Sequence, residues 1–402
     1  MVQLRINYLN NYIIFIYLLI IFFILPVQYN PIVDSLFFMI SAISFIITFL
    51  LKIQTKQEIK LKIVDIILYF FIGIIYIFVL LFSPYPKSNI TVNFIYMIFI
   101  IYYFYRNNLI TPNGLSQRFY KFAYLFMFAS LLIQFYLSLR QTKTLYFVIG
   151  WDKNYTGVIL FFFFSFCYKR KFIIGLAFAV FISIFLGSRG YILMLLLFFI
   201  IIIFKKSFYR LVEKVPFKRM WRVLLLLLMT ITLFSFFWVN VISSKNVVDY
   251  QQGLNDTSNK MRFVANIKAI DLLSTDRYLS LFGYDNDLKK VLGIDSSNLG
   301  EHSRYYGVRL VQPHNSILNT VVKTGILFSV LYFLIISRTI DKYYLKENLQ
   351  YIFPYIACSM IMHSLLNTSF LLFFLLILHT PTNKSPFVIR CLKKQGSFAN
   401  KM

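Results

Sequence analysis

The stretch YIIFIYLLIIFFIL, residues 12–25, decides the class of fold because it contains no charged side chain. Blocks of the same kind recur along the chain, including VLLLLLMTITLFSFFWV at 223–239 and SFLLFFLLIL at 369–378. The chain is 59% hydrophobic and 20% aromatic, with a mean hydropathy of +0.70, whereas a soluble domain is about half apolar. Blocks of about 18 or more apolar residues are long enough to cross a hydrocarbon core. The sequence therefore predicts an all-α, polytopic membrane protein.

Counting these blocks gives about twelve transmembrane helices. The predicted spans are 10–27, 32–51, 63–83, 90–105, 119–139, 155–168, 172–187, 190–204, 222–242, 316–337, 350–366 and 368–380. Residues 1–242 thus hold the first nine helices, 243–315 a long loop, 316–380 the last three helices, and 381–402 a basic tail. The first block ends in ILPVQYNP without a small-residue cleavage site, which predicts a retained helix.

The distribution of charge predicts the orientation of these helices. The chain has a net charge of +26, and most of its Lys and Arg lie in short connections between apolar blocks. By the positive-inside rule these connections face the cytoplasm, and so do both termini. The basic connections are 52–62, 106–121, 169–171, 205–222 and 338–349, and the tail after residue 381 is also basic. No basic stripe is interleaved with stacking aromatics, so we exclude nucleic acid as a partner.

The opposite, outer side is predicted to carry the long loop 243–315. This loop holds eight of the fifteen acidic residues, and a connection of about seventy residues is usually functional. Within it, SNKMRFVANIKAIDLLS (258–274) has apolar residues at helical spacing behind a Ser/Asn cap, which predicts an amphipathic helix. DLKKVLG (287–293) predicts a second, short helix. The amphipathic helix is expected to lie across the outer mouth of the bundle.

Arg189 is the first candidate for chemistry. It lies in FLGSRGYILML (185–195), where the sequence predicts a tight turn between two spans on the outer side. A cation there usually has an anionic partner, and the guanidinium offers two parallel donors to phosphate oxygens. Gly187 and Gly190 would let a polyanion approach closely. The alternative is an arginine that extends to the outer interface without binding a ligand.

Two further candidates lie on the same side. Arg262, on the amphipathic helix, is either a ligand for an anion or a solvated helix residue. His314, in VQPHNSILNTVVKTGI (311–326), precedes a span, and an imidazole can take or give a proton near neutral pH. The structural alternative is a capped helix start, and Asn315 and Ser316 would cap that helix in either case.

Other polar residues on the predicted outer face are candidates for substrate binding. Asp152 and Asn154 in GWDKNYTG lie at a helix start, where capping is the alternative. Lys323 is expected about 10 Å below the start of its helix, lining a cavity or extending out of it. The end of the long loop is cationic, with Arg304 and Arg309. DND (285–287) is interpreted as a polar turn, and the three cysteines form neither a disulfide framework nor a metal-ligand spacing.

Taken in order, these motifs resemble those of the O-antigen ligase/polymerase family. The resemblance covers roughly residues 150–335 and is carried by WDKN, by GSRGYILMLLL, by KMRFVANIKAIDLLSTDRYLSLFGYD in the long loop, and by HNSILNTVVKTGIL. It implies an integral-membrane glycosyltransferase with a GT-C-like helical bundle. Such enzymes transfer a glycan from undecaprenyl pyrophosphate to an acceptor hydroxyl and need no metal or other cofactor. Lys323 stands where members often have an acidic residue.

Carried over by motif, Arg189 and Arg262 would hold the pyrophosphate, and His314 would act as base or orient the acceptor. Asn315, Arg304, Arg309, Lys323 and Asn154 are expected to bind substrate. The implied partners are the lipid-linked glycan, a glycan acceptor and membrane lipid, together with a flippase and a chain-length regulator. We expect a polysaccharide polymerase in the bacterial inner membrane, acting on its outer face. The alternatives are a ligase of the same family and a lipid-linked glycan transporter, although the sequence shows none of the internal repeats typical of transporters.

Overall fold

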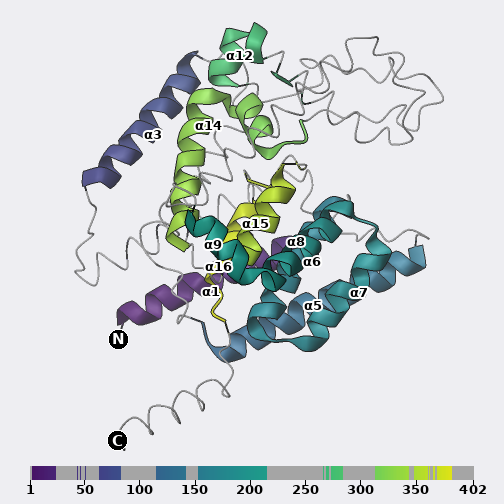
Figure 1. Ribbon diagram of the computed structural model, residues 1–402. Helices are drawn as coiled ribbons and strands as arrows, with labels where there is room; N and C mark the ends of the chain where they lie inside the picture. Colours follow the sequence, from purple (N-terminus) through teal and green to yellow (C-terminus); the bar gives the residue numbers. More distant parts are fainter. Residues whose placement is uncertain are drawn as a thin grey trace, which may run out of the picture.

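The computed structural model describes residues 2–23, 63–82, 115–141, 153–214, 273–283, 313–343, 348–360 and 369–382, with a few single residues between these ranges. Within them all regular structure is helical, and no strand occurs (Figure 1). The helices are α1 (Val2–Phe23), α3 (Ile63–Phe82), α5 (Gln117–Gln141), α6 (Lys153–Arg170), α7 (Ile173–Leu186), α8 (Arg189–Ile203), α9 (Lys205–Lys214), α12 (Arg277–Phe282), α14 (Ser316–Tyr343), α15 (Leu349–Ser359) and α16 (Ser369–His379).

The predicted all-helical class is confirmed for the described residues. By length and composition, two of their helices are able to cross a membrane, through Gln117–Arg140 of α5 and Ser316–Asp341 of α14. α7, with 14 residues, and α8, with 15, are apolar but shorter than the roughly 20 residues of a full crossing. The predicted spans at 90–105 and 222–242 and almost all of 32–51 lie outside the described residues, as do most of the long loop and the tail beyond 382.

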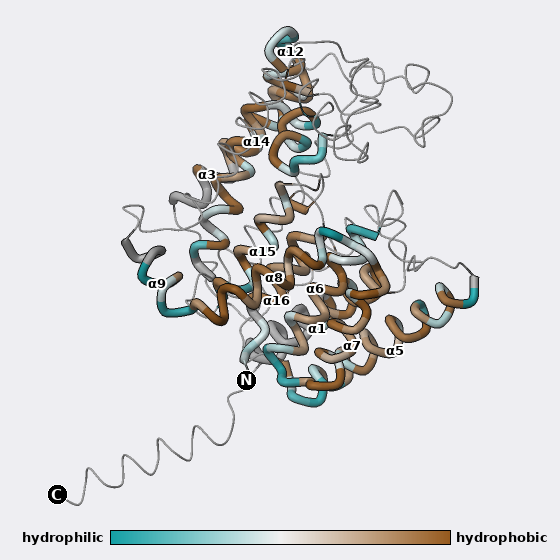
Figure 2. Tube along the Cα trace, turned by 45° about the vertical axis from the view of Figure 1, so that its right-hand side comes forward, coloured by the Kyte–Doolittle hydropathy of each residue, from teal (hydrophilic) through white to brown (hydrophobic). Residues whose placement is uncertain are grey.

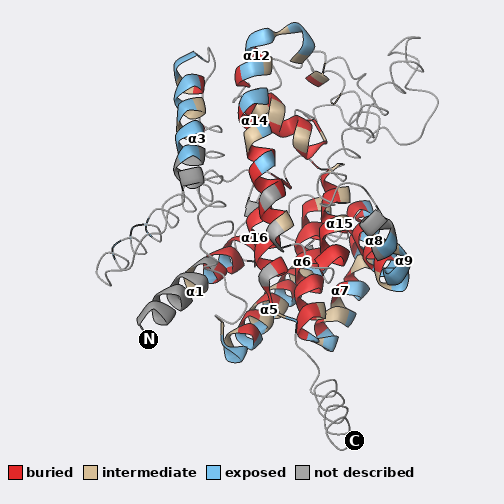
Figure 3. Cartoon of the chain, turned by 60° about the vertical axis from the view of Figure 1, so that its left-hand side comes forward, coloured by how far each residue is buried: buried red, intermediate tan, exposed pale blue. Residues whose placement is uncertain are grey.

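Helix α6 forms the centre of the bundle. Fifteen of its 18 residues are buried, because α7, α8 and α16 pack around it (Figure 3). Aromatic rings fill the space between the helices: Phe22 of α1 stacks on Phe373 of α16 with centroids 4.9 Å apart. Tyr355 of α15 stacks on Phe374 at 4.0 Å. Offset stacks of this kind add to the stabilisation from burial alone.

The carboxyl end of α6 differs from the prediction. The sequence KRK (169–171) was expected to be a basic connection, but α6 continues to Arg170, and both Lys169 and Arg170 are buried. The Lys169 ammonium donates hydrogen bonds to Asn348 Oδ1 (3.0 Å), Leu378 O (2.9 Å) and Thr380 O (3.3 Å). A cation is stable here because it satisfies the last carbonyls of α16 and interacts favourably with the helix dipole.

A second correction concerns α9. Residues 205–222 were expected to be a basic connection, but Lys205–Lys214 form a helix. Its Phe208 ring lies 5.5 Å from the ring of Phe353 on α15. The aromatic side chain of Phe208 thus anchors this charged segment against α15.

The predicted span 316–337 lies within α14, but that helix is broken at Gly325, where φ is 76° and ψ is 165°. The short helix α12 packs against the break, and its C-terminal Gly283 has the same φ of 76°. A Cβ on Gly283 would lie 2.5 Å from the backbone N of Gly325. Glycine is therefore needed at both positions for the end of α12 and the break in α14 to approach each other this closely.

Candidate functional site

The turn that carries Arg189 has the tight form predicted for it. Gly187 is the C-cap of α7, with a positive φ of 57°, and the next residue, Ser188, is the N-cap of α8. The Ser188 hydroxyl caps α8 by accepting a hydrogen bond from Tyr191 N at 3.3 Å. Ser188 itself is fully buried, whereas Arg189 is exposed at the first position of α8. The turn thus places an exposed arginine directly after a buried helix cap.

Asn154 lies beside this turn. Ser188 Oγ is 3.4 Å from Asn154 Oδ1, which makes the hydroxyl a bridge between the first turns of α6 and α8. The two helices cross at Gly157, where a Cβ would lie 2.7 Å from Tyr191 Cβ and 2.9 Å from Ser188 Oγ. Small residues allow such close approach of helices. The structure therefore brings Asn154 and the Arg189 turn together.

His314 lies directly before α14, where Asn315 provides the helix cap. Asn315 is buried, and its Oδ1 accepts hydrogen bonds from Ile317 N and Leu318 N, each at 3.0 Å. This confirms the capping role predicted for Asn315. Ser316 has a different role from the one predicted: its hydroxyl donates to Met362 O at 2.6 Å and accepts from Leu365 N at 3.2 Å.

The carboxyl end of α15 connects the His314 and Arg189 segments. On one side, Asn315 Nδ2 donates to Met360 O at 3.5 Å. On the other, a Cβ on Gly190 would lie 3.5 Å from Cys358 Sγ. The Cys358 thiol in turn lies 3.4 Å from Met362 Sδ. α15 ends at Ser359, before the predicted 366, and the Ser316 hydroxyl bonds to Met362 O and Leu365 N beyond that end.

The first turns of α6, α8 and α14 therefore lie at one end of the bundle, around the end of α15. We call this the Arg189 end (Figure 1). Each helix N-terminus carries about half a positive charge. Lys153 and Arg189 are exposed at the first positions of α6 and α8, and half-buried His314 comes two residues before α14. Helix N-termini gathered in this way favour an anionic ligand.

Lys323 is not part of this group. It is half-buried and precedes the break at Gly325, and its backbone lies against Gly283 of α12. Eight residues of helix separate it from Asn315, which corresponds to about 12 Å along the axis. The expected role of Lys323 in substrate binding stays a prediction, and Lys323 lies near α12 instead of at the Arg189 end.

Several predicted residues lie outside the described part of the chain. They are Arg262, Arg304 and Arg309, together with most of the predicted helix 258–274 and all of 287–293. Their roles stay predictions. Within the described ranges, His, Cys, Asp and Glu nowhere form a group of three or more that could hold a metal ion.

Sequence reasoning missed the residues that assemble this end. Gly157, Ser188, Cys358 and Met362 position the candidate residues without carrying charge. A small residue such as Gly157 within a block of large apolar ones is a usable signal of close helix approach. Sequence reasoning also missed α12. Its start signal is Asp276, whose carboxylate accepts a hydrogen bond from Leu279 N at 3.0 Å, and its stop signal is Gly283.

Comparison with known proteins adds no relative: no family model, no curated protein and no solved structure matches the chain. The function is therefore argued from the motifs and from the geometry of the Arg189 end.

Proposed function

We propose that the chain is a multi-pass protein of the bacterial inner membrane and a glycosyltransferase of the O-antigen ligase/polymerase type. On this proposal it uses a glycan carried on undecaprenyl pyrophosphate and has about twelve spans in a GT-C-like bundle. Two separate observations support it. One is the exposure pattern of the helices, which supports the membrane. The other is the contact of Asn154 with the Arg189 turn, and the link from that turn through the end of α15 to the start of α14, which supports the chemistry.

The membrane placement is supported by helices whose polar side faces inward. On α5, Gln134 is buried and its Nε2 donates to Phe23 O at 3.2 Å. On the outer face of the same helix, Leu125 and Ile133 are 60% and 59% exposed. Large apolar side chains are also exposed on α3, α7 and α8, whose traces are mostly hydrophobic in Figure 2. Soluble proteins rarely expose continuous apolar surfaces of this extent, and lipid is the solvent that suits them.

The chemistry is supported by the convergence at the Arg189 end. A pyrophosphate leaving group requires stabilisation of negative charge more than covalent catalysis. Exposed Arg189 offers two parallel donors to phosphate oxygens, at a place where three helix N-termini also contribute positive charge. Arg262 is the proposed second arginine of this clamp. Asn154 is proposed to hold the donor from the start of α6.

His314 is proposed to activate the acceptor. The acceptor hydroxyl oxygen attacks the anomeric carbon of the donor sugar while its proton passes to the imidazole. A new glycosidic bond forms, and the bond between the anomeric carbon and the pyrophosphate oxygen breaks. Undecaprenyl pyrophosphate leaves with the bonding electron pair, neutralised by the guanidiniums. Asn315 fixes the backbone next to His314 by capping α14.

The test is the length of the glycan made in a deletion strain complemented with wild type, Arg189→Ala or His314→Ala at matched membrane levels. Arg140→Ala is the control, because Arg140 is exposed in the last turn of α5 and is not one of the residues proposed to act on the substrate. Wild type and Arg140→Ala should give long chains, and the other two variants single lipid-linked repeats. Long chains from Arg189→Ala or His314→Ala would refute the role of that residue.

The same experiment separates the alternatives. If the deletion strain accumulates long polymer that is not attached to its acceptor, the enzyme is a ligase. If it accumulates repeat units on the cytoplasmic face, the protein is a transporter, and the glycosyltransferase proposal is wrong.

A further inference from the structure

The end of the bundle opposite to Arg189 carries a group of exposed cations. Arg170 contacts Gln117 of α5 and Pro381 after α16, and Lys169 contacts Asn348 before α15, so these helix ends lie together. α6 and α8 run parallel, because their first turns meet through Asn154 and Ser188 and the rings of Tyr168 and Phe198, further along both helices, lie 5.0 Å apart. α9 follows α8 and therefore begins at this end. The exposed cations at this end of the bundle, which we call the basic collar, are Arg118, Lys121, Lys171, Lys205, Lys206 and Arg210.

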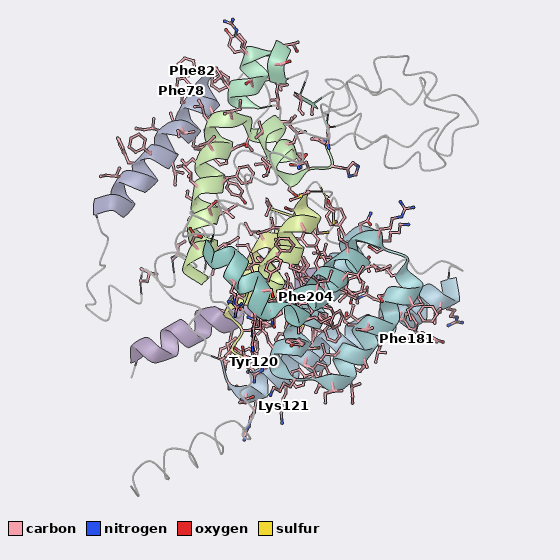
Figure 4. The ribbon with its side chains drawn as sticks, in the orientation of Figure 1. Phe78, Phe82, Tyr120, Lys121, Phe181 and Phe204 are labelled. Carbon is pink, nitrogen blue, oxygen red and sulfur yellow. The ribbon has the colours of Figure 1, made fainter. Side chains whose placement is uncertain are left out.

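The basic collar coincides with the edge of the exposed apolar surface. On α5, exposed Lys121 is followed by Phe122, which is 55% exposed. Between α6 and α7, exposed Lys171 is followed within two residues by Ile173, which is 76% exposed. On α8, Phe204 is 57% exposed and Lys205 comes next (Figure 4). Three separate segments thus change from apolar to cationic at the same end, as expected where hydrocarbon meets headgroups.

Helix α9 contributes half of the basic collar. The chain bends at Phe204, with φ −94° and ψ 24°, and continues as α9. Phe208 turns toward α15, where it meets Phe353. Lys206 and Arg210 are four residues apart and share a face. Each is two residues from Phe208, which places that face on the far side of the helix. The apolar side of α9 is thus used for packing, and its cationic side is left exposed.

We propose that the basic collar, with α9 as its main part, binds the phosphate groups of anionic phospholipids in the leaflet at this end of the protein. Phospholipid is the partner that fits both halves of the surface, since its acyl chains suit Phe122, Ile173 and Phe204 and its phosphate suits the neighbouring cations. Basic residues near a membrane surface are attracted to anionic headgroups in this way. The inference rests on the proposed membrane placement and not on the proposed glycosyl transfer.

The test is binding of short-chain phosphatidylglycerol to the purified full-length protein in detergent, with short-chain phosphatidylcholine as the neutral lipid, measured by native mass spectrometry. The variant is the triple substitution Lys205→Gln, Lys206→Gln and Arg210→Gln. We expect phosphatidylglycerol affinity to fall about fivefold for each cation removed, while phosphatidylcholine binding stays unchanged. A second variant, Lys205→Arg with Lys206→Arg, keeps the charge and should keep wild-type binding.

The matched control removes two exposed cations elsewhere, by Arg140→Gln and Arg277→Gln, and is compared with the double substitution Lys206→Gln and Arg210→Gln. It lowers the net charge equally and should retain phosphatidylglycerol binding. Undiminished binding in the α9 variant, or equal loss in the control, would overturn the proposal, as would equal affinity of wild type for the two lipids. Because the readout is lipid binding, failure of the lipid proposal would leave the glycan assay of Arg189 and His314 unaffected. Failure of the glycosyltransferase proposal would likewise leave the lipid-binding result unaffected.

Discussion

Gly157 is the residue whose enlargement should most directly disturb the Arg189 end. In Gly157→Ala the new methyl carbon would lie 2.7 Å from Tyr191 Cβ and 2.9 Å from Ser188 Oγ. Carbon atoms pack best at about 3.5–4.0 Å, so the overlap is close to 1 Å. Tyr191 is fully buried and its hydroxyl donates to Ala179 O at 2.9 Å. The ring has no room to move away, and α8 must shift relative to α6.

The expected loss of stability follows from two opposing effects. Overpacking of a tight contact costs about 1–3 kcal/mol, and replacing a helical Gly by Ala returns at most about 1 kcal/mol. With the full gain, the net destabilisation is therefore up to about 2 kcal/mol. Activity should fall much further, because the shift moves Ser188 and Arg189, and a misplacement of about 1 Å at a reacting centre can reduce the rate about 100-fold.

The assay pairs thermal unfolding of the purified protein in detergent with the glycan chain-length measurement. Gly73→Ala is the control, since no atom lies within 4 Å of the position its Cβ would take. Gly190→Ala is intermediate, with its nearest neighbour at 3.5 Å, an ordinary contact. We expect neither to lose stability. If Gly157→Ala were as stable and as active as wild type, the close crossing of α6 and α8 would not position Arg189, and the reasoning would fail.

Three further substitutions test other parts of the structure. Lys169→Met should lower the unfolding temperature, because Thr380 O loses this donor at a cost of about 1–3 kcal/mol and Leu378 O keeps only the 3.4 Å hydrogen bond from Asn348 Nδ2. Lys171→Met, at an exposed position, should not lower it. Gly325→Ala should release α12 from α14 and increase protease cleavage near residue 283, since its Cβ would lie 2.1 Å from a backbone oxygen of α12. Asn315→Ala should cost about 1 kcal/mol through loss of the cap, and Asn315→Asp should restore that stability.

Each of these has a result that would contradict it. Equal unfolding temperatures for Lys169→Met and Lys171→Met would show that the buried ammonium contributes nothing. An unchanged cleavage pattern in Gly325→Ala would show that the break does not depend on glycine. If Asn315→Ala and Asn315→Asp unfolded alike, the cap would not be the reason for the amide at that position.

The positions of the helices could be read from the sequence because apolar blocks are local. The predicted spans 63–83, 172–187 and 190–204 agree with α3, α7 and α8 to within a residue or two. The tight turn at Arg189 was equally local, since Gly187 and Gly190 flank it. Asn315 as a cap follows from the residues directly after it.

What the sequence could not predict depends on contacts between distant segments. Lys169 belongs to a basic stretch that is typical of a solvated connection, and only the fold places Asn348 and the end of α16 beside it. Gly325 is an unremarked small residue within an apolar block until α12 approaches it. The meeting of Asn154 with the Arg189 turn depends on Ser188 and Gly157, and their contacts become visible only once α6 and α8 are packed.

The central claim is that the Arg189 end transfers glycan from a pyrophosphate-linked lipid, and it is tested most directly with purified protein in lipid vesicles. The measurement is release of undecaprenyl pyrophosphate from a lipid-linked repeat unit, for wild type, Arg189→Ala, His314→Ala and Arg140→Ala. The account predicts release together with glycan extension by wild type and Arg140→Ala, and loss of both with the other two variants. Release at the wild-type rate by Arg189→Ala and His314→Ala would contradict it.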